Sequence, residues 1–142
     1  MSPCVFHDTE PSLQDRRLFE IIEKAYGRRE KVVIFAETEE RAAAIDRTLW
    51  IHKQESFIPH ETYAADKPEP SVPIVIVTSE FNPIGAGILV ADGHCSLEFA
   101  LSFGTVHEFV DRSSPQIHEA CRERFRAYRA RHVPLEHSKQ SG

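Results

Sequence analysis

Cysteine is scarce in this sequence, and its spacing excludes several classes of protein. The chain has 3 cysteines, Cys4, Cys95 and Cys121, which are odd in number and far apart. They provide neither a disulfide framework nor a paired-cysteine metal site, which fits a reducing cytoplasm. We expect all three to be small, buried hydrophobic side chains.

Long apolar runs are also missing. No stretch approaches the roughly 20 apolar residues that a membrane-spanning helix needs. Residues 1–4 lack the basic stretch and apolar core of a secretory signal. We therefore expect a cytoplasmic protein with no membrane partner.

Positive charge is in short supply overall but concentrated near the C-terminus. Lys and Arg number 17 against 22 Asp and Glu, which gives a formal net charge of -5. A nucleic-acid backbone would repel the molecule as a whole. The basic residues near the end are Arg122, Arg124, Arg126, Arg129 and Arg131. This asymmetry favours a short acidic peptide as partner. Direct binding of single-stranded DNA is a further hypothesis, disfavoured by the net charge and by the few interleaved aromatics.

The usual signatures of catalysis, metal binding and phosphate binding are absent from the sequence. Gly85-Ala86-Gly87 is the only glycine-rich spot, and it has neither a third glycine nor an adjacent Gly-Lys-Ser/Thr. None of the 8 histidines pairs with another at the i, i+4 spacing of a helical metal site. We expect no catalysis, cofactor or metal. The alternative is a nucleotide-binding or hydrolytic enzyme with a site near Gly85–Gly87. A Cys–His pair assembled in space also stays open, because spacing does not reveal it.

Alternating strand and helix patterns predict a single α/β domain. Apolar runs predict strands at residues 4–7, 31–36, 73–77, 87–90 and 106–110. Helical spacing and end signals predict helices over 13–26 (stopped by Gly27), from the N-cap Thr38 through Leu49, and from Ser114-Pro115 onward. This order predicts a three-layer sandwich with a mainly parallel sheet flanked by helices over residues 1–135. Residues 136–142 are expected to be a flexible C-terminal tail.

Two large aromatic residues fall in the middle of the chain. Trp50 ends the second predicted helix, and Phe57 lies in the following Phe-x-Pro loop. Such residues are binding anchors when they protrude and core residues when they do not. The nearby Ile45 and Leu49 favour a core position for Trp50 on periodicity alone.

The final helix carries an apolar stripe beside a basic one. The apolar stripe is Ile117, Cys121, Phe125 and Tyr128, and the basic stripe is Arg122, Arg126 and Arg129. Pairing with Glu119 and Glu123 at i, i+3 would make the basic stripe an ordinary solvated face. Arginine is also the residue best suited to holding a carboxylate. The alternative to an ordinary solvated face is therefore a binding site for a peptide with an acidic run and a hydrophobic last residue.

Taken together, these stretches resemble the chi subunit family of bacterial DNA polymerase III. Residues 45–50 (IDRTLW) and 55–60 (ESFIPH) are similar to that family's LDxxLW and ESFxPH blocks. Residues 121–129 (CRERFRAYR) resemble its RERYKxYR block, with Phe125 and Arg126 in place of Tyr and Lys. The resemblance runs from about residue 4 to residue 135. It implies a Rossmann-like fold without a nucleotide site, in a non-catalytic clamp-loader subunit attached through a partner called psi.

The resemblance also implies two binding surfaces. The acidic C-terminal tail of single-stranded DNA-binding protein (SSB), which ends in Phe, would be bound by Arg122, Phe125, Arg126, Tyr128 and Arg129. One arginine would hold the terminal carboxylate, and the apolar edge would receive the Phe ring. Trp50 and Phe57 match the surface that meets psi or a helicase competing with psi, which implies that both are exposed. Contact with DNA would be indirect, through SSB.

Overall fold

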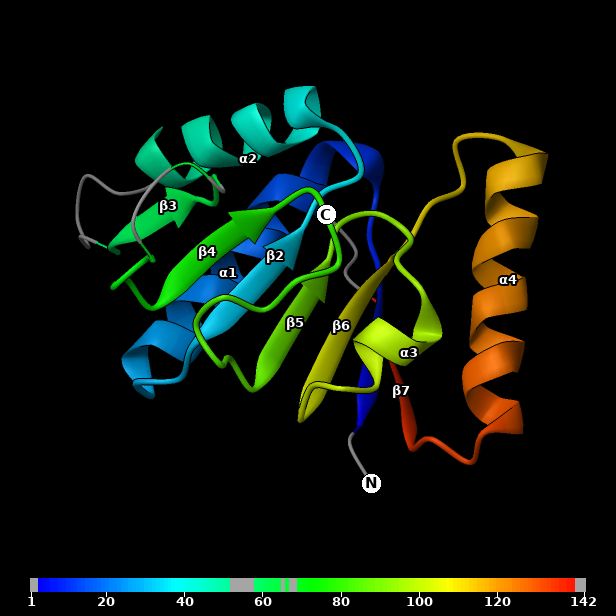
Figure 1. Ribbon diagram of the computed structural model, residues 1–142. Helices are drawn as coiled ribbons and strands as arrows, with labels where there is room; N and C mark the ends of the chain where they lie inside the picture. Colours follow the sequence, from blue (N-terminus) through cyan, green and yellow to red (C-terminus); the bar gives the residue numbers. More distant parts are fainter. Residues whose placement is uncertain (1–2, 52–57, 65, 67–68, 140–142) are drawn as a thin grey trace.

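A computed structural model describes residues 3–51, 58–64, 66 and 69–139, which form one sheet of seven strands with four α-helices (Figure 1). The strands are β1 (Cys4–Asp8), β2 (Val32–Phe35), β3 (His60–Thr62), β4 (Ile74–Val77), β5 (Ile88–Ala91), β6 (Thr105–Val110) and β7 (Leu135–Lys139). The helices are α1 (Gln14–Gly27), α2 (Glu39–Ile51), α3 (Leu97–Ala100) and α4 (Pro115–Ala130), with a 3-10 turn at Pro11–Leu13.

The strand pairings of the described sheet are all parallel, in the order β3-β4-β2-β5-β6-β1-β7. Parallel neighbours need crossover connections, and helices provide several of them. The chain passes from β1 through α1 to β2, fills the sheet on one side of β2, and then returns to add β5 and β6 on the other side. The carboxyl ends of β2 and β5 are therefore neighbours at the point where the strand order reverses.

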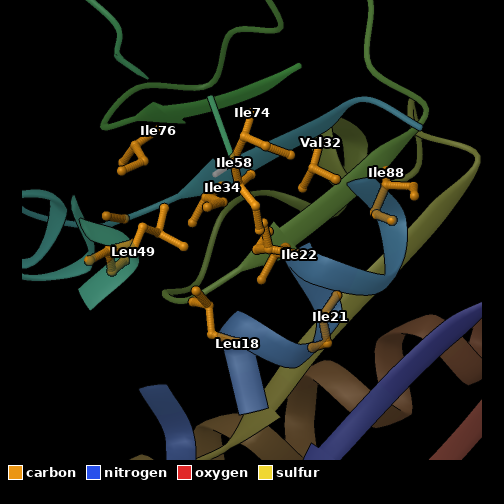
Figure 2. Packing of buried hydrophobic residues seen from close by; sticks show 14 of the residues in the cluster. Leu18, Ile21, Ile22, Val32, Ile34, Leu49, Ile58, Ile74, Ile76 and Ile88 are labelled. Carbon is orange, nitrogen blue, oxygen red and sulfur yellow. The ribbon is translucent and has the colours of Figure 1, made fainter. Parts of the chain in front are cut away.

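Two hydrophobic clusters fill the space on either side of the sheet. The first joins α1 and α2 to residues of the central strands, and Figure 2 shows Leu18, Ile22 and Leu49 turned toward the strand residues Ile34 and Ile76. The second lies on the opposite face and includes Ala100 of α3 and Tyr128 of α4. All four residues of β2, of β4 and of β5 are buried, as expected when helices cover both faces. This confirms the three-layer α/β prediction.

The five predicted strands and three predicted helices are confirmed, and most of their predicted ends lie within one or two residues of the observed ends. Two further strands were not predicted. Leu135–Lys139 form β7, which pairs in parallel with β1, so the prediction of a flexible tail beginning at 136 is wrong for residues 136–139. β7 is an edge strand whose residues are exposed or half-exposed, and it therefore needs no apolar pattern. Its pairing comes from backbone hydrogen bonds, beginning with the Cys4 amide and the Pro134 carbonyl at 2.9 Å.

Gly27 does not stop α1 in the way its residue type suggests. It is the last helical residue, and the left-handed conformation that follows belongs to Arg29, whose φ is 60°. The short α3 was also not predicted. Its N-cap is Ser96, whose hydroxyl accepts the Phe99 amide at 3.1 Å. Four residues are too few to show a helical repeat in the sequence.

Candidate functional site

Helix α4 begins where its sequence indicates, at Ser114 and Pro115. The Ser114 hydroxyl accepts the Ile117 amide at 3.1 Å, and Pro115 occupies the first turn, where its missing N–H costs nothing. At the other end, His132 takes a positive φ of 59°, and its amide donates to the Arg129 carbonyl at 3.0 Å. The chain then turns back into β7. These two ends place the helix along β1 and β6, on the face of the sheet opposite α1.

The inner face of α4 is fastened to the sheet by a buried polar cluster. The carboxylate of Glu108 on β6 is buried and accepts two hydrogen bonds from Arg124, at 3.0 and 2.5 Å. It also accepts the Tyr128 hydroxyl at 2.6 Å. Burial first, and then the adjacent Glu108 carboxylate, raise the pKa of Tyr128 well above its usual value. The Arg124 and Tyr128 side chains therefore hold α4 against the sheet through Glu108.

The prediction that Tyr128 takes part in peptide binding needs a correction for this reason. The resemblance places it beside the peptide site, but its relative exposure is 0%. Its ring packs against Phe6 with centroids 5.9 Å apart, and its hydroxyl is bound to Glu108. Tyr128 contributes to such a site by fixing α4, and it cannot contact a bound peptide in this arrangement.

The outer face of α4 presents three arginines to solvent. The Arg122 side chain is 61% exposed and lies 3.9 Å from Glu119. Arg126 is equally exposed and pairs with Glu119 at 3.1 Å and with Glu123 at 2.5 Å. Arg129 is exposed too, and among the described residues it makes no side-chain hydrogen bond or ion pair. The i, i+3 pairing expected from the sequence is therefore present. Exposed ion pairs of this kind contribute little, so the arginines can exchange partners readily.

Between the two faces of α4 lies a small apolar pocket. Its floor is formed by Phe6 of β1, Val110 of β6, and Cys121 and Phe125 of α4. Phe6 and Phe125 meet edge to face with ring centroids 5.2 Å apart. The volume of the pocket is about 140 Å³. An engineered apolar cavity of about 150 Å³ holds benzene, so a single aromatic ring fits a space of this size.

Basic and imidazole side chains form the rim of this pocket. They are Arg112, His118, Arg122 and His137. Arg112 donates to Asp8 at 2.6 Å, and the His137 ring lies 3.3 Å from the same carboxylate. Burial would raise the pKa of Asp8, but its hydrogen bonds with Arg112 and His137 more than offset this, so the pKa is below its usual value. Asp8 therefore stays ionised and holds both rim residues in place.

Sequence reasoning missed most of this rim. It singled out Arg122 and Phe125, and the structure brings both to the pocket. Arg112 comes from the loop after β6, and His137 from a strand that was not predicted. Only the three-dimensional fold unites residues so far apart along the chain. The basic character of the stretch around α4 was the one available signal.

The second surface implied by the resemblance consists of Trp50 and Phe57, and the structure describes the part around Trp50, which is exposed. Trp50 is 54% exposed and Ile51 is 67% exposed, at the end of α2. Periodicity had favoured a core position for Trp50, and that prediction is wrong. Ile45 and Leu49 are buried, and Trp50 follows Leu49 by one residue, which turns it about 100° away from the core. Phe57 lies outside the described residues.

The alternative nucleotide or hydrolytic site finds little support around Gly85–Gly87. Gly85 has a φ of 61° in a tight turn, and the Asn82 side chain closes it by accepting the Ala86 amide at 2.9 Å and donating to the Ala86 carbonyl at 3.0 Å. The segment lies before β5, at the amino end of the strand. Open α/β sheets bind ligands at the carboxyl ends.

The carboxyl ends of β2 and β5 do enclose a cavity of about 310 Å³. Its lining includes Glu37, Asp92 and Asp111, and Arg41 is already bound to Asp92 through two hydrogen bonds at 2.8 Å. Carboxylates facing the space disfavour a phosphate group there. The structure also shows no cluster of metal-binding side chains in its described part, and no helix there is long and apolar enough to cross a membrane.

Comparison with known proteins points to one family. The family described as "DNA polymerase III chi subunit, HolC" matches residues 1–136. The DNA polymerase III subunit chi of Escherichia coli (strain K12) is 29% identical over 119 residues, covering 83% of this chain and 80% of that protein. The subunit chi of Pseudomonas aeruginosa is 27% identical over 135 residues, covering 93% and 90%.

A solved structure supports the fold independently. It is described as "Mss116p DEAD-box helicase domain 2 bound to an RNA duplex" and superposes with a TM-score of 0.68. The match covers 100% of this chain but 65% of the length of that one, at 13% sequence identity. A likeness at this identity shows the fold alone.

Proposed function

Because this chain belongs to the DNA polymerase III chi subunit family, we propose that it is a non-catalytic accessory subunit that connects the clamp loader to SSB. In this proposal the α4 pocket, formed by Phe6, Val110, Cys121 and Phe125, binds the C-terminal tail of SSB. The tail is acidic and ends in Phe. Binding to it brings the replicase to SSB-coated template without direct recognition of DNA.

The pocket is the observation that carries this proposal. It is apolar, of a size that suits one aromatic ring, and open beside exposed arginines. A terminal Phe presents a ring and a carboxylate on the same residue, so a ring in the pocket brings the carboxylate to the rim. Arg122 or Arg112 can then hold the carboxylate through charge-assisted hydrogen bonds.

The remaining arginines suit the acidic part of the tail. Arg126 and Arg129 continue along the outer face of α4 from Arg122, at helical spacing. Aspartates that precede the last residue would compete with Glu119 and Glu123 for the Arg126 guanidinium. Since such contacts are exposed to solvent, they should speed association more than they tighten the complex.

A second partner fits the other end of the molecule. Trp50 and Ile51 form an exposed apolar pair on α2, and tryptophan is the residue type most enriched among interface anchors. We propose that this pair, with Phe57, contacts psi or a helicase that competes with psi. The two surfaces lie on different helices, α4 and α2, at different ends of the sheet (Figure 1). One chain can therefore bind both partners at once.

A titration with tail peptides tests the main proposal. A labelled peptide with the SSB tail sequence should bind with modest affinity, measured by fluorescence anisotropy. Removing the last Phe, or converting its carboxylate to an amide, should weaken binding strongly, because each change removes one of the two groups that the pocket and rim receive. Equal binding of all three peptides would contradict the assignment to this pocket.

A further inference from the structure

Two residues of α2 and the first residue of β3 meet near the end of α2. Asp46 and Trp50 are four positions apart on α2, so they lie on the same side of the helix. His60 is the first residue of β3. Its Nε2 atom is 3.0 Å from Asp46 Oδ1, and its ring meets the Trp50 ring edge to face, with centroids 5.2 Å apart.

The surroundings of His60 hold its ring in place. The side chain is completely buried, and Nδ1 lies 3.0 Å from the Ile58 carbonyl oxygen. A carbonyl only accepts, so Nδ1 carries a proton. Nε2 is buried, and its position relative to Asp46 does not meet hydrogen-bond geometry, which leaves it without a hydrogen-bond partner among the described residues. The Asp46 carboxylate lies 3.0 Å from it.

The His60 ring is held from two sides. Its Nδ1 atom is bound to the Ile58 carbonyl, and its Nε2 atom lies against the Asp46 carboxylate. These contacts fix His60 between α2 and the start of β3, and the Trp50 ring packs against that fixed ring.

We propose that His60 and Asp46 are positioning residues for the partner-binding anchor Trp50. The inference rests on the proposed function, since it takes the Trp50 surface to be the site of the psi contact. The contact between Asp46 and His60 holds the indole in one orientation before the partner arrives. An anchor that is already ordered avoids the entropy cost of ordering it on binding. His60 itself is buried and does not touch the partner.

The free protein provides the first test, because Trp50 is the only tryptophan in the chain. The emission of an indole depends on the groups that contact its ring, and His60 is such a group. Asp46→Asn and His60→Gln should therefore change Trp50 emission, and they should lower its nanosecond anisotropy as the ring gains freedom. Glu40→Gln is the matched control, because it removes a carboxylate from an exposed position in the first turn of the same helix. Its emission and anisotropy should equal those of the wild type.

Binding to purified psi provides the second test, in a double-mutant cycle. Immobilising one side chain costs about 0.5–1.5 kcal/mol, which corresponds to about two- to tenfold in affinity. Asp46→Asn and His60→Gln should each weaken binding by this factor. In a Trp50→Ala background, neither should weaken it further, since there is no longer an anchor to position. A purely structural role would give the same loss in both backgrounds.

The two tests separate the possible failures. Unchanged Trp50 emission and anisotropy in both variants would overturn the positioning role, and so would equal losses with and without Trp50. Binding of the SSB-tail peptide to α4 shows that each variant is folded. If the wild-type chain does not bind psi, the proposed function fails at this surface, while the emission of the free protein still decides the role of His60.

Discussion

Arg122 and Arg124 are two positions apart on α4, yet their surroundings are opposite. Arg124 faces the sheet, where its side chain is 11% exposed and is bound to the buried Glu108 carboxylate. Arg122 faces solvent, where its exposed partner Glu119 is 3.9 Å away. Two residues of a helix are about 200° of rotation, which is enough to move a side chain from one face to the other.

The two faces therefore use the same chemical group for different tasks. On the inner face, the guanidinium is already surrounded by acceptors from Glu108 and Cys95, so it holds the helix against the sheet. On the outer face, the guanidinium groups have weak partners that another carboxylate can replace. A rigid inner face gives the outer face a fixed position, which a binding surface needs.

The largest expected effect is on stability, from the inner face. Arg124→Ala leaves the Glu108 carboxylate buried without its cation, and such changes cost about 3–5 kcal/mol. Urea unfolding followed by circular dichroism should show a loss in the free energy of unfolding of this size. Arg122→Ala is the matched control and should change stability by at most about 0.5 kcal/mol. Equal losses in the two variants would abolish the distinction between the faces.

The next effect is on binding, from the outer face. Arg122→Ala should weaken affinity for the SSB-tail peptide by about tenfold, since a hydrogen bond to a charged group contributes on the order of 1.5 kcal/mol. The unfolding curve should stay as in the wild type. Arg131→Ala is a suitable control, because Arg131 is also exposed but lies beyond the last residue of α4. Unchanged peptide affinity in Arg122→Ala would count heavily against the pocket.

Salt should also separate the two faces. Raising the salt concentration from 0.05 to 0.5 M shortens the screening length to a few ångströms, so we expect tail affinity to fall by about fivefold. The buried Glu108–Arg124 pair is shielded from the solution, and its contribution to stability should change little. The stability difference between the wild type and Arg124→Ala, measured at both salt concentrations, checks this. A tail affinity independent of salt would indicate that the arginines take no part in binding.

Local sequence patterns were sufficient to predict the helix but not which residues of its apolar stripe are accessible. Phe125 and Tyr128 are three positions apart, which is about 60° around a helix, so both fall within one stripe. The structure buries Tyr128 and leaves Phe125 partly exposed at the pocket. What separates them is Glu108, a carboxylate on a strand that the helix covers. Its position relative to Tyr128 follows from tertiary packing and is invisible in a single sequence.

The rim of the pocket illustrates a second limit. Asp8 brings Arg112 and His137 together. Arg112 is 104 positions from Asp8 in the sequence, and His137 is 129 positions from it. Strand β7, which carries His137, contains no continuous apolar run because it lies at the sheet edge. Patterns of hydrophobicity reveal buried strands and helices, and binding rims are often built from the parts that such patterns do not describe.

The smallest expected effect concerns the acidic residues that already accompany the outer arginines. Glu119 contacts both Arg122 and Arg126, and the hydrogen bond from Arg126 lowers the pKa of Glu119. An incoming acidic tail must compete with this carboxylate. Glu119→Gln should therefore strengthen tail binding by about twofold, in keeping with the small contribution of exposed ion pairs. Calorimetric titration with the peptide measures the change, and Glu136→Gln on β7 is a control with the same change of charge. A gain in both variants would show that net charge alone favours the tail, whereas a gain confined to Glu119→Gln shows that Glu119 occupies the place of the tail's own aspartates.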